Sequence, residues 1–137
     1  MSYPLTHIEG LDVDEIQSLK AVGIRTTERL LEDAKNPKGR KLLAARTAID
    51  EKRLLMFANA CDHLRIKGMG PGYVVLLREV GVDTVRELRY RKPANLVSAM
   101  AEANRKKKLV RLLPSSKLVV RWIDEAKKLP LKITYKK

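Results

Sequence analysis

The chain has 137 residues, 45% of them hydrophobic and 33% charged, with a formal net charge of +13. No apolar run reaches the roughly 18 residues of a membrane span, residues 1–4 lack the features of a signal peptide, and Cys61 alone forms no disulfide framework. We therefore expect a cytoplasmic protein without a membrane partner. The charge is uneven, because residues 1–64 carry ten Lys/Arg and ten Asp/Glu, whereas residues 65–137 carry nineteen and six.

Helix start signals dominate the first half of the chain. Asp12 followed by Glu15 is a capping-box pattern, Gly23 suits the position after a helix end, and Asn36-Pro37 places proline at a first helical position. The predicted helices are residues 13–22, a short helix that Thr26 caps, a helix that starts at Pro37, and residues 50–64.

The second half repeats this order of helices. Its start signals are Pro71, Thr84 with Glu87, Pro93, and Ser115 or Ser116, and its end signals are Gly81 and Pro130. We predict an all-α fold of about eight helices packed as one compact unit, because each half alone is short for an independent core. The expected divisions are 1–64, 65–130 and a basic tail, 131–137, that is extended or disordered.

One sequence pattern occurs twice, 58 residues apart. Ile8-Glu9-Gly10-Leu11 through Thr26 matches Ile66-Lys67-Gly68-Met69 through Thr84, and the matched positions are turn glycines and apolar residues at helical spacing. A repeat that keeps such positions and changes the others repeats a backbone shape. Here the shape is a tight glycine hairpin that leads into a helix.

The second copy has the composition of a phosphate-binding site. Gly68 and Gly70 permit backbone angles and a close approach that a Cβ would block. The N–H groups at the start of the helix after Pro71 lack intrahelical partners and suit a phosphate oxygen. Met69 is expected to point inward and hold the loop. The alternative is that the glycines only make a tight interhelical turn.

The first copy is degenerate at the same positions. Asp12 replaces the glycine that matches Gly70, and Glu9 replaces Lys67. Carboxylates at the helix start would occupy or repel a phosphate, so we interpret this hairpin as structural.

The second copy, an apolar-x-Gly-apolar-Gly sequence between two helices, resembles the helix-hairpin-helix motif, which binds nucleic-acid backbones independently of sequence. Over roughly residues 3–130 the chain also resembles the DUF4332 family within the helix-hairpin-helix superfamily. The segments that carry this resemblance are Ile8-Glu9-Gly10-Leu11, Lys67-Gly68-Met69-Gly70-Pro71, residues 81–88, Leu112-Leu113-Pro114-Ser115 and Val120-Arg121-Trp122-Ile123. The resemblance implies an all-helical fold with tandem helix-hairpin-helix repeats and a nucleic-acid-binding ancestry, and it supplies no reaction.

Three further basic clusters occur outside the hairpins. Residues 105–108 form the densest run and could clamp a second stretch of phosphate backbone, or they could be a solvated loop. Residues 89–92 are similar, and residues 38–41 rank last. Because aromatic residues make up only 4% of the chain, contacts with a duplex backbone are favoured over base stacking.

Catalytic signals are weak. Cys61-Asp62-His63 contains the residue types of a nucleophile, an acid and a base, but neighbours along a helix point in different directions. We expect Cys61 to be a small core residue and His63 a surface residue. One cysteine and two histidines far apart make no zinc site. The sequence therefore predicts neither an enzyme nor a metal or other cofactor.

The sequence thus favours a monomeric, nucleic-acid-binding module, with DNA a better candidate than RNA and no small-molecule substrate evident. The alternative is a protein-interaction or scaffold module that uses the basic half against an acidic partner. The residues expected to bind nucleic acid are Arg65, Lys67, Gly68, Met69, Gly70, Gly72, Tyr73, Arg105, Lys106, Lys107 and Lys108.

Overall fold

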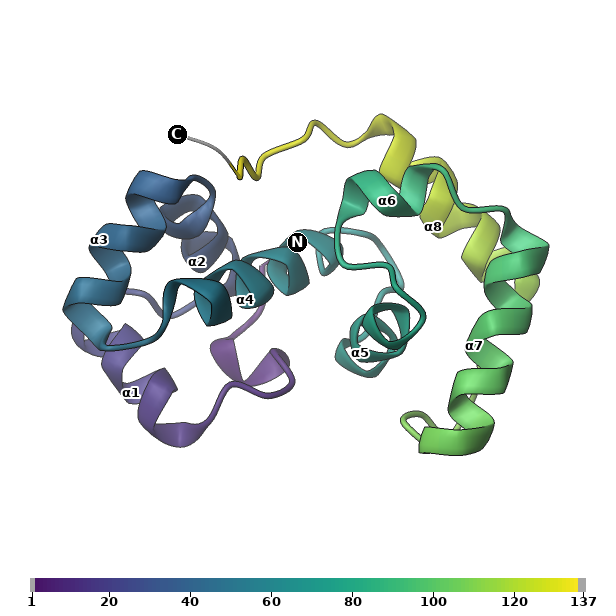
Figure 1. Ribbon diagram of the computed structural model, residues 1–137, viewed down its shortest axis with the longest axis horizontal. Coiled ribbons are helices and arrows are strands. Elements are labelled where there is room, and N and C mark those ends of the chain that lie inside the picture. Colours follow the sequence, from purple (N-terminus) through teal and green to yellow (C-terminus); the bar gives the residue numbers. More distant parts are fainter. Residues whose placement is uncertain (1, 136–137) are drawn as a thin grey trace.

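The computed structural model describes residues 2–135, and this part of the chain forms eight α-helices, one 3₁₀ helix and no strand (Figure 1). The predicted all-α class is confirmed. In Figure 1, α1 to α3 lie at one end, α6 to α8 lie at the other, and α4 and α5 lie between them. The elements are η1 (Leu5–His7), α1 (Val13–Ala21), α2 (Thr27–Ala34), α3 (Pro37–Thr47), α4 (Glu51–His63), α5 (Pro71–Glu79), α6 (Val85–Arg89), α7 (Pro93–Lys107) and α8 (Ser116–Lys128).

The caps predicted from the sequence set most of the helix starts. Side chains accept a hydrogen bond from the first turn of six helices, which satisfies a donor that has no intrahelical partner. These capping residues are Asp12, Thr26, Asn36, Asp50, Thr84 and Ser115. The helices α5 and α7 instead begin with a proline and have no side-chain cap.

The backbone shape of the first hairpin (residues 8–12) recurs in the second hairpin (residues 66–70). The helices that follow, α1 and α5, have nine residues each and begin 58 residues apart. Gly10 and Gly68 have φ of +89° and +81°, a left-handed conformation that glycine adopts without strain. The sequence repeat is therefore a repeat of conformation.

We call residues 2–64 the first unit and residues 65–128 the second unit. A second repeat, with an offset of 65 residues, relates α4, the last helix of the first unit, to α8, the last helix of the second unit. α2 packs on α4, and α6 packs on α8. The buried side chains Leu54, Phe57, Ala58 and Cys61 of α4 correspond to Val119, Trp122, Ile123 and Ala126 of α8. α4 also contacts α5 and α6, so one helix closes the first unit and leads into the second hairpin.

Side chains near the end of α4 are buried. His63 is 1% exposed, so the expectation that it is a surface residue is wrong, whereas Cys61 is a core residue as expected. The ring of His63 packs where α5 and α6 cover α4, and its Nδ1 lies 3.1 Å from the carbonyl oxygen of Asn59. Burial lowers the pKa of His63 to about 4 because a charged ring would lose its hydration.

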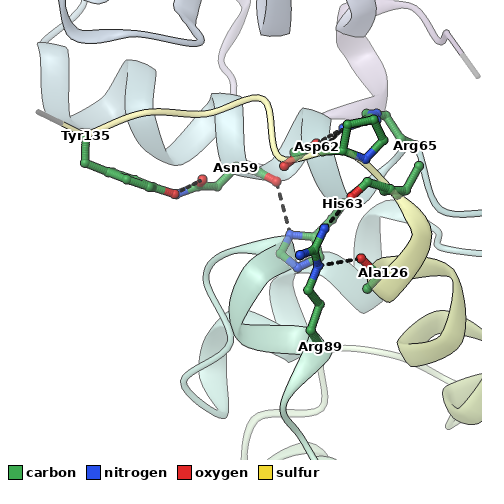
Figure 2. Close-up of polar contacts among 9 residues, drawn as sticks. Asn59, Asp62, His63, Arg65, Arg89, Ala126 and Tyr135 are labelled. Carbon is green, nitrogen blue, oxygen red and sulfur yellow. Dashed lines mark hydrogen bonds and ion pairs between the residues drawn. The ribbon is translucent and has the colours of Figure 1, made fainter.

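The residues after α8 run in an extended conformation back to the first unit (Figure 1). We call residues 129–135 the strap. Its Thr134 N–H donates to the Lys35 carbonyl oxygen over 2.7 Å, and its carbonyl oxygens accept hydrogen bonds from Arg40, Arg65 and Arg89. Figure 2 shows how Arg89, Arg65 and Tyr135 connect the strap to α4 and α6. The strap thus joins the two units through its backbone.

Candidate nucleic-acid interface

The start of α5 leaves backbone donors open. Gly70 occupies the N-cap position without a side-chain cap, and Pro71 has no N–H. The carbonyl oxygen of Gly70 accepts from Tyr73 and Val74, at 3.1 and 3.2 Å, but within residues 2–135 the N–H groups of Gly70 and Gly72 have no acceptor. These two N–H groups carry the partial positive charge of a helix N-terminus.

The second hairpin rests on α8. A Cβ on Gly68 would lie 3.1 Å from the Leu118 side chain and 3.8 Å from Nε1 of Trp122. Met69 is 3% exposed and holds the hairpin from within, as expected. The Lys67 N–H donates to the Glu125 carboxylate over 3.0 Å. The hairpin backbone is therefore fixed before any ligand binds.

A loop between α7 and α8, residues 109–113, lies against the first turn of α5. Gly72 makes this approach possible, because a Cβ there would be 3.1 Å from the Val110 side chain. The hydroxyl of Tyr73 donates to the Leu112 carbonyl oxygen over 3.0 Å. Together they border a hollow of about 260 Å³ that is lined by Gly70, Gly72, Tyr73, Val110, Arg111 and Leu112. Arg111 is exposed and makes no ion pair with a described residue.

Two side chains from the predicted set hold the protein together. Arg65 forms an ion pair with Asp62 at 2.5 Å and donates to the Pro130 carbonyl oxygen, with 16% of its side chain exposed (Figure 2). Tyr73 packs its ring against Trp122 with 5.2 Å between centroids, besides its bond to the loop. The sequence predicted that Arg65 and Tyr73 bind nucleic acid. In the structure both side chains are partly buried and contact other parts of the protein. Lys67 keeps an exposed side chain beside the hairpin.

The basic run 105–108 ends α7 and leads directly into the loop. Arg105 and Lys106 both reach Glu102, at 2.8 and 3.7 Å, and Lys107 reaches Glu79 at 3.5 Å. All these side chains are more than one-third exposed, and exposed ion pairs of this kind contribute little to stability. A phosphate can therefore displace them at little cost. The structure places the run next to the hollow along the chain.

Sequence reasoning missed three cations near the second hairpin. Arg111 lines the hollow, and Arg121 lies on α8 between Leu118 and Glu125, both of which contact the hairpin. Residues three and four apart share a helix face, so Arg121 lies on the same face of α8 as Leu118 and Glu125, and Lys117 lies one turn before it. The sequence predicted the apolar face of α8, but no local pattern indicated which hairpin that helix would support.

Three observations concern other kinds of site. The described residues contain no group of three His, Cys, Asp or Glu side chains that could hold a metal ion. Burial raises the pKa of the Cys61 thiol, which keeps it protonated. None of the described helices combines the length and the apolar character that crossing a membrane requires.

Comparison with known proteins places the chain by family. A family model described as a domain of unknown function (DUF4332) matches residues 9–129, which include residues 9–12 of the first hairpin, the whole second hairpin and all eight α-helices. No curated protein and no solved structure matches the chain.

Proposed function

We propose that this chain, which belongs to the DUF4332 family, is a nucleic-acid-binding module without enzymatic activity, built from tandem helix-hairpin-helix repeats. The second hairpin holds a backbone phosphate of duplex DNA through the N–H groups of Gly70 and Gly72. The first hairpin is structural.

One observation carries the proposal, namely the glycine at position 70. Its φ of −83° suits any residue, and a Cβ there would meet no atom within 4 Å. At an N-cap, Asp, Asn or Ser would stabilise the helix more than glycine. Neither conformation nor packing thus favours glycine here. A phosphate on the open N–H groups would favour it, because the missing side chain leaves room for the phosphate oxygens.

The surrounding charge supports a polyanion. Arg111 lines the same hollow, Lys67 and Arg121 flank the hairpin, and residues 105–108 extend the basic surface along α7. Phosphates are the same at every step, so recognition is largely independent of sequence. The hairpin offers no open aromatic platform, since Tyr73 and Trp122 pack on each other. Backbone contact with a duplex is therefore favoured over stacking on single strands.

The test is a titration of a labelled 20-base-pair duplex, followed by fluorescence anisotropy at several salt concentrations. If three to five phosphates are neutralised, the logarithm of the association constant should fall with that of the salt concentration with a slope of roughly −3 to −4.5. Trp122, the single tryptophan, lies behind Gly68, so its fluorescence provides a second, local signal. Absence of binding at low salt would contradict the proposal and favour an acidic protein partner.

A further inference from the structure

The loop between α7 and α8 presents an apolar side chain beside the proposed phosphate site. Leu112 is 76% exposed and its neighbour Leu113 is 39% exposed. Leu112 lines the same hollow as Gly70 and Gly72. Other apolar side chains, such as Val13 and Leu42, are also exposed, but Leu112 is set apart by its place in the hollow that borders the open N–H groups.

The backbone that carries Leu112 is held on both sides. Asn104 of α7 donates to the Val110 carbonyl oxygen over 3.0 Å and accepts from the Val110 N–H over 2.9 Å. Tyr73 of α5 holds the Leu112 carbonyl oxygen over 3.0 Å. The loop is therefore ordered without help from the Leu112 side chain, which remains available for an external contact.

The surroundings of Leu112 indicate the chemistry of the partner. Arg111 precedes Leu112, Lys108 lies immediately before the loop, and the open N–H groups of α5 border the same hollow. A purely apolar protein groove would leave these positive groups unpaired. A base step framed by phosphates offers an apolar stack and negative charge together, and apolar wedges that enter such steps are a known mode of groove recognition.

We propose that Leu112 is a wedge that enters between bases next to the phosphate held at Gly70 and Gly72, which rests on the function proposed above. Separating stacked bases costs a few kcal/mol per step, and the cost is smaller where stacking is already interrupted. The protein should therefore prefer a duplex that contains a bulged base over an intact duplex of the same sequence.

The test compares two 20-base-pair duplexes that differ only in one bulged 2-aminopurine. Wild-type protein should bind the bulged duplex about tenfold more tightly, which corresponds to about 1.4 kcal/mol. Binding should also change the 2-aminopurine fluorescence. Leu112→Ala should bring the affinity ratio close to one, because the variant loses the contact that the bulged duplex favours.

The matched control is Leu42→Ala, since Leu42 of α3 is 56% exposed and lies in the first unit. It should retain the wild-type ratio, and circular dichroism checks that both variants are folded. Equal wild-type affinity for the two duplexes, or a ratio that Leu112→Ala leaves intact, would overturn the wedge and leave the phosphate site standing. Failure of wild-type protein to bind either duplex would overturn the proposed function and the wedge together.

Discussion

The two hairpins share one backbone shape, but the first caps the N-terminus of the following helix and the second leaves it uncapped. At the first hairpin, Asp12 accepts from the Glu15 N–H over 2.8 Å, and Glu15 accepts from the Asp12 N–H over 3.1 Å. At the second hairpin, Gly70 stands at the position of Asp12 and provides no cap. Fold alone therefore does not decide whether such a hairpin can hold an anion. Under the proposed function, the side chain at the N-cap decides it.

The difference extends to the helix that supports each hairpin. Arg53 of α4 reaches Glu15 at 2.7 Å, donates to the Gly10 carbonyl oxygen over 3.0 Å and lies over the Phe57 ring. The corresponding position on α8 is Leu118, which packs against Gly68. The first hairpin is closed by charges that satisfy one another. The second packs on Leu118 and donates its Lys67 N–H to Glu125, while the N–H groups of Gly70 and Gly72 stay open.

Gly70→Asp should give the largest effect, because it installs the cap of the first hairpin on the second. We expect the affinity for duplex DNA to fall at least about a hundredfold, since two hydrogen bonds to a charged group are lost, each worth about 1.5–3 kcal/mol. The melting temperature should rise slightly, because aspartate at an N-cap is more stabilising than glycine by a few tenths of a kcal/mol. Anisotropy and calorimetry measure the two effects.

Two further variants test whether charge and position matter. Gly70→Asn caps α5 without a charge and should lose less affinity than Gly70→Asp. Asp12→Gly, the reciprocal change, should leave DNA binding as it is and cost a few tenths of a kcal/mol of stability. If Gly70→Asp binds as wild type does, the comparison between the hairpins has no bearing on function.

The next largest effect concerns pH and the end of α4. His63 is neutral in the folded protein with a pKa of about 4, while the unfolded chain has the ordinary value of 6.5. As pH falls from 6.5 to 4, the imidazole becomes protonated in the unfolded chain but stays largely neutral in the folded state. The free energy of unfolding should therefore drop by about 3 kcal/mol. Above pH 6.5 both states are neutral and this contribution vanishes.

His63→Gln should remove that part of the pH dependence, as urea titrations at several pH values would measure. Burial raises the pKa of the neighbouring Asp62 carboxyl. As pH falls, the folded state therefore protonates Asp62 before the unfolded chain does, and this group alone would increase stability. The comparison of His63→Gln with wild type separates the two groups. A variant whose stability falls as steeply as wild type between pH 6.5 and 4 would contradict the assignment to His63.

Arg53→Ala should have a smaller effect that is confined to the first hairpin. It removes a partly exposed ion pair, one hydrogen bond to a carbonyl oxygen and a cation–π contact, for a total of about 1–2 kcal/mol of stability. Binding to DNA should not change, because the first hairpin is structural.

Arg53 also lowers the pKa of Glu15, so the stabilisation in wild type is lost as pH falls through that lowered value. A large loss of DNA affinity in folded Arg53→Ala would show that the first hairpin takes part in binding.

Arg111→Gln should produce the smallest effect. Loss of one phosphate contact should weaken binding a few-fold and make the salt slope shallower by about 1. Lys41→Gln in the first unit is the matched control and should leave the slope unchanged. Equal slopes for both variants would remove Arg111 from the interface.

The local features of the fold could be predicted from the sequence, because they depend on neighbouring residues. Capping side chains, prolines at helix starts and turn glycines act over three to five positions, and they gave the six capped starts correctly. The burial of His63 could not be predicted in this way. Its environment comes from α5 and α6, which pack on α4 only after the chain has turned twice.

The same limit applies to the candidate interface. Gly70 was identified because the glycine hairpin is a local sequence pattern, although its φ of −83° does not require a glycine. The role of Arg65 at the strap depends on a residue 65 positions away, and the role of Tyr73 at the loop depends on a residue 39 positions away. The place of Arg111 beside Gly70 could not be predicted either, because it depends on the packing of the loop against α5. Gly72 has neither a turn nor a positive φ, and only its contact with Val110 explains it.

The most direct measurement is a titration of ¹⁵N-labelled protein with duplex DNA, followed through the backbone amides of both hairpins. The account predicts the largest shifts at Gly70 and Gly72, with little change at Asp12 and Asp14, which occupy the same two positions in the first repeat. Shifts restricted to residues 105–108 and other surface lysines, with Gly70 and Gly72 unmoved, would contradict the claim that the second hairpin holds the phosphate.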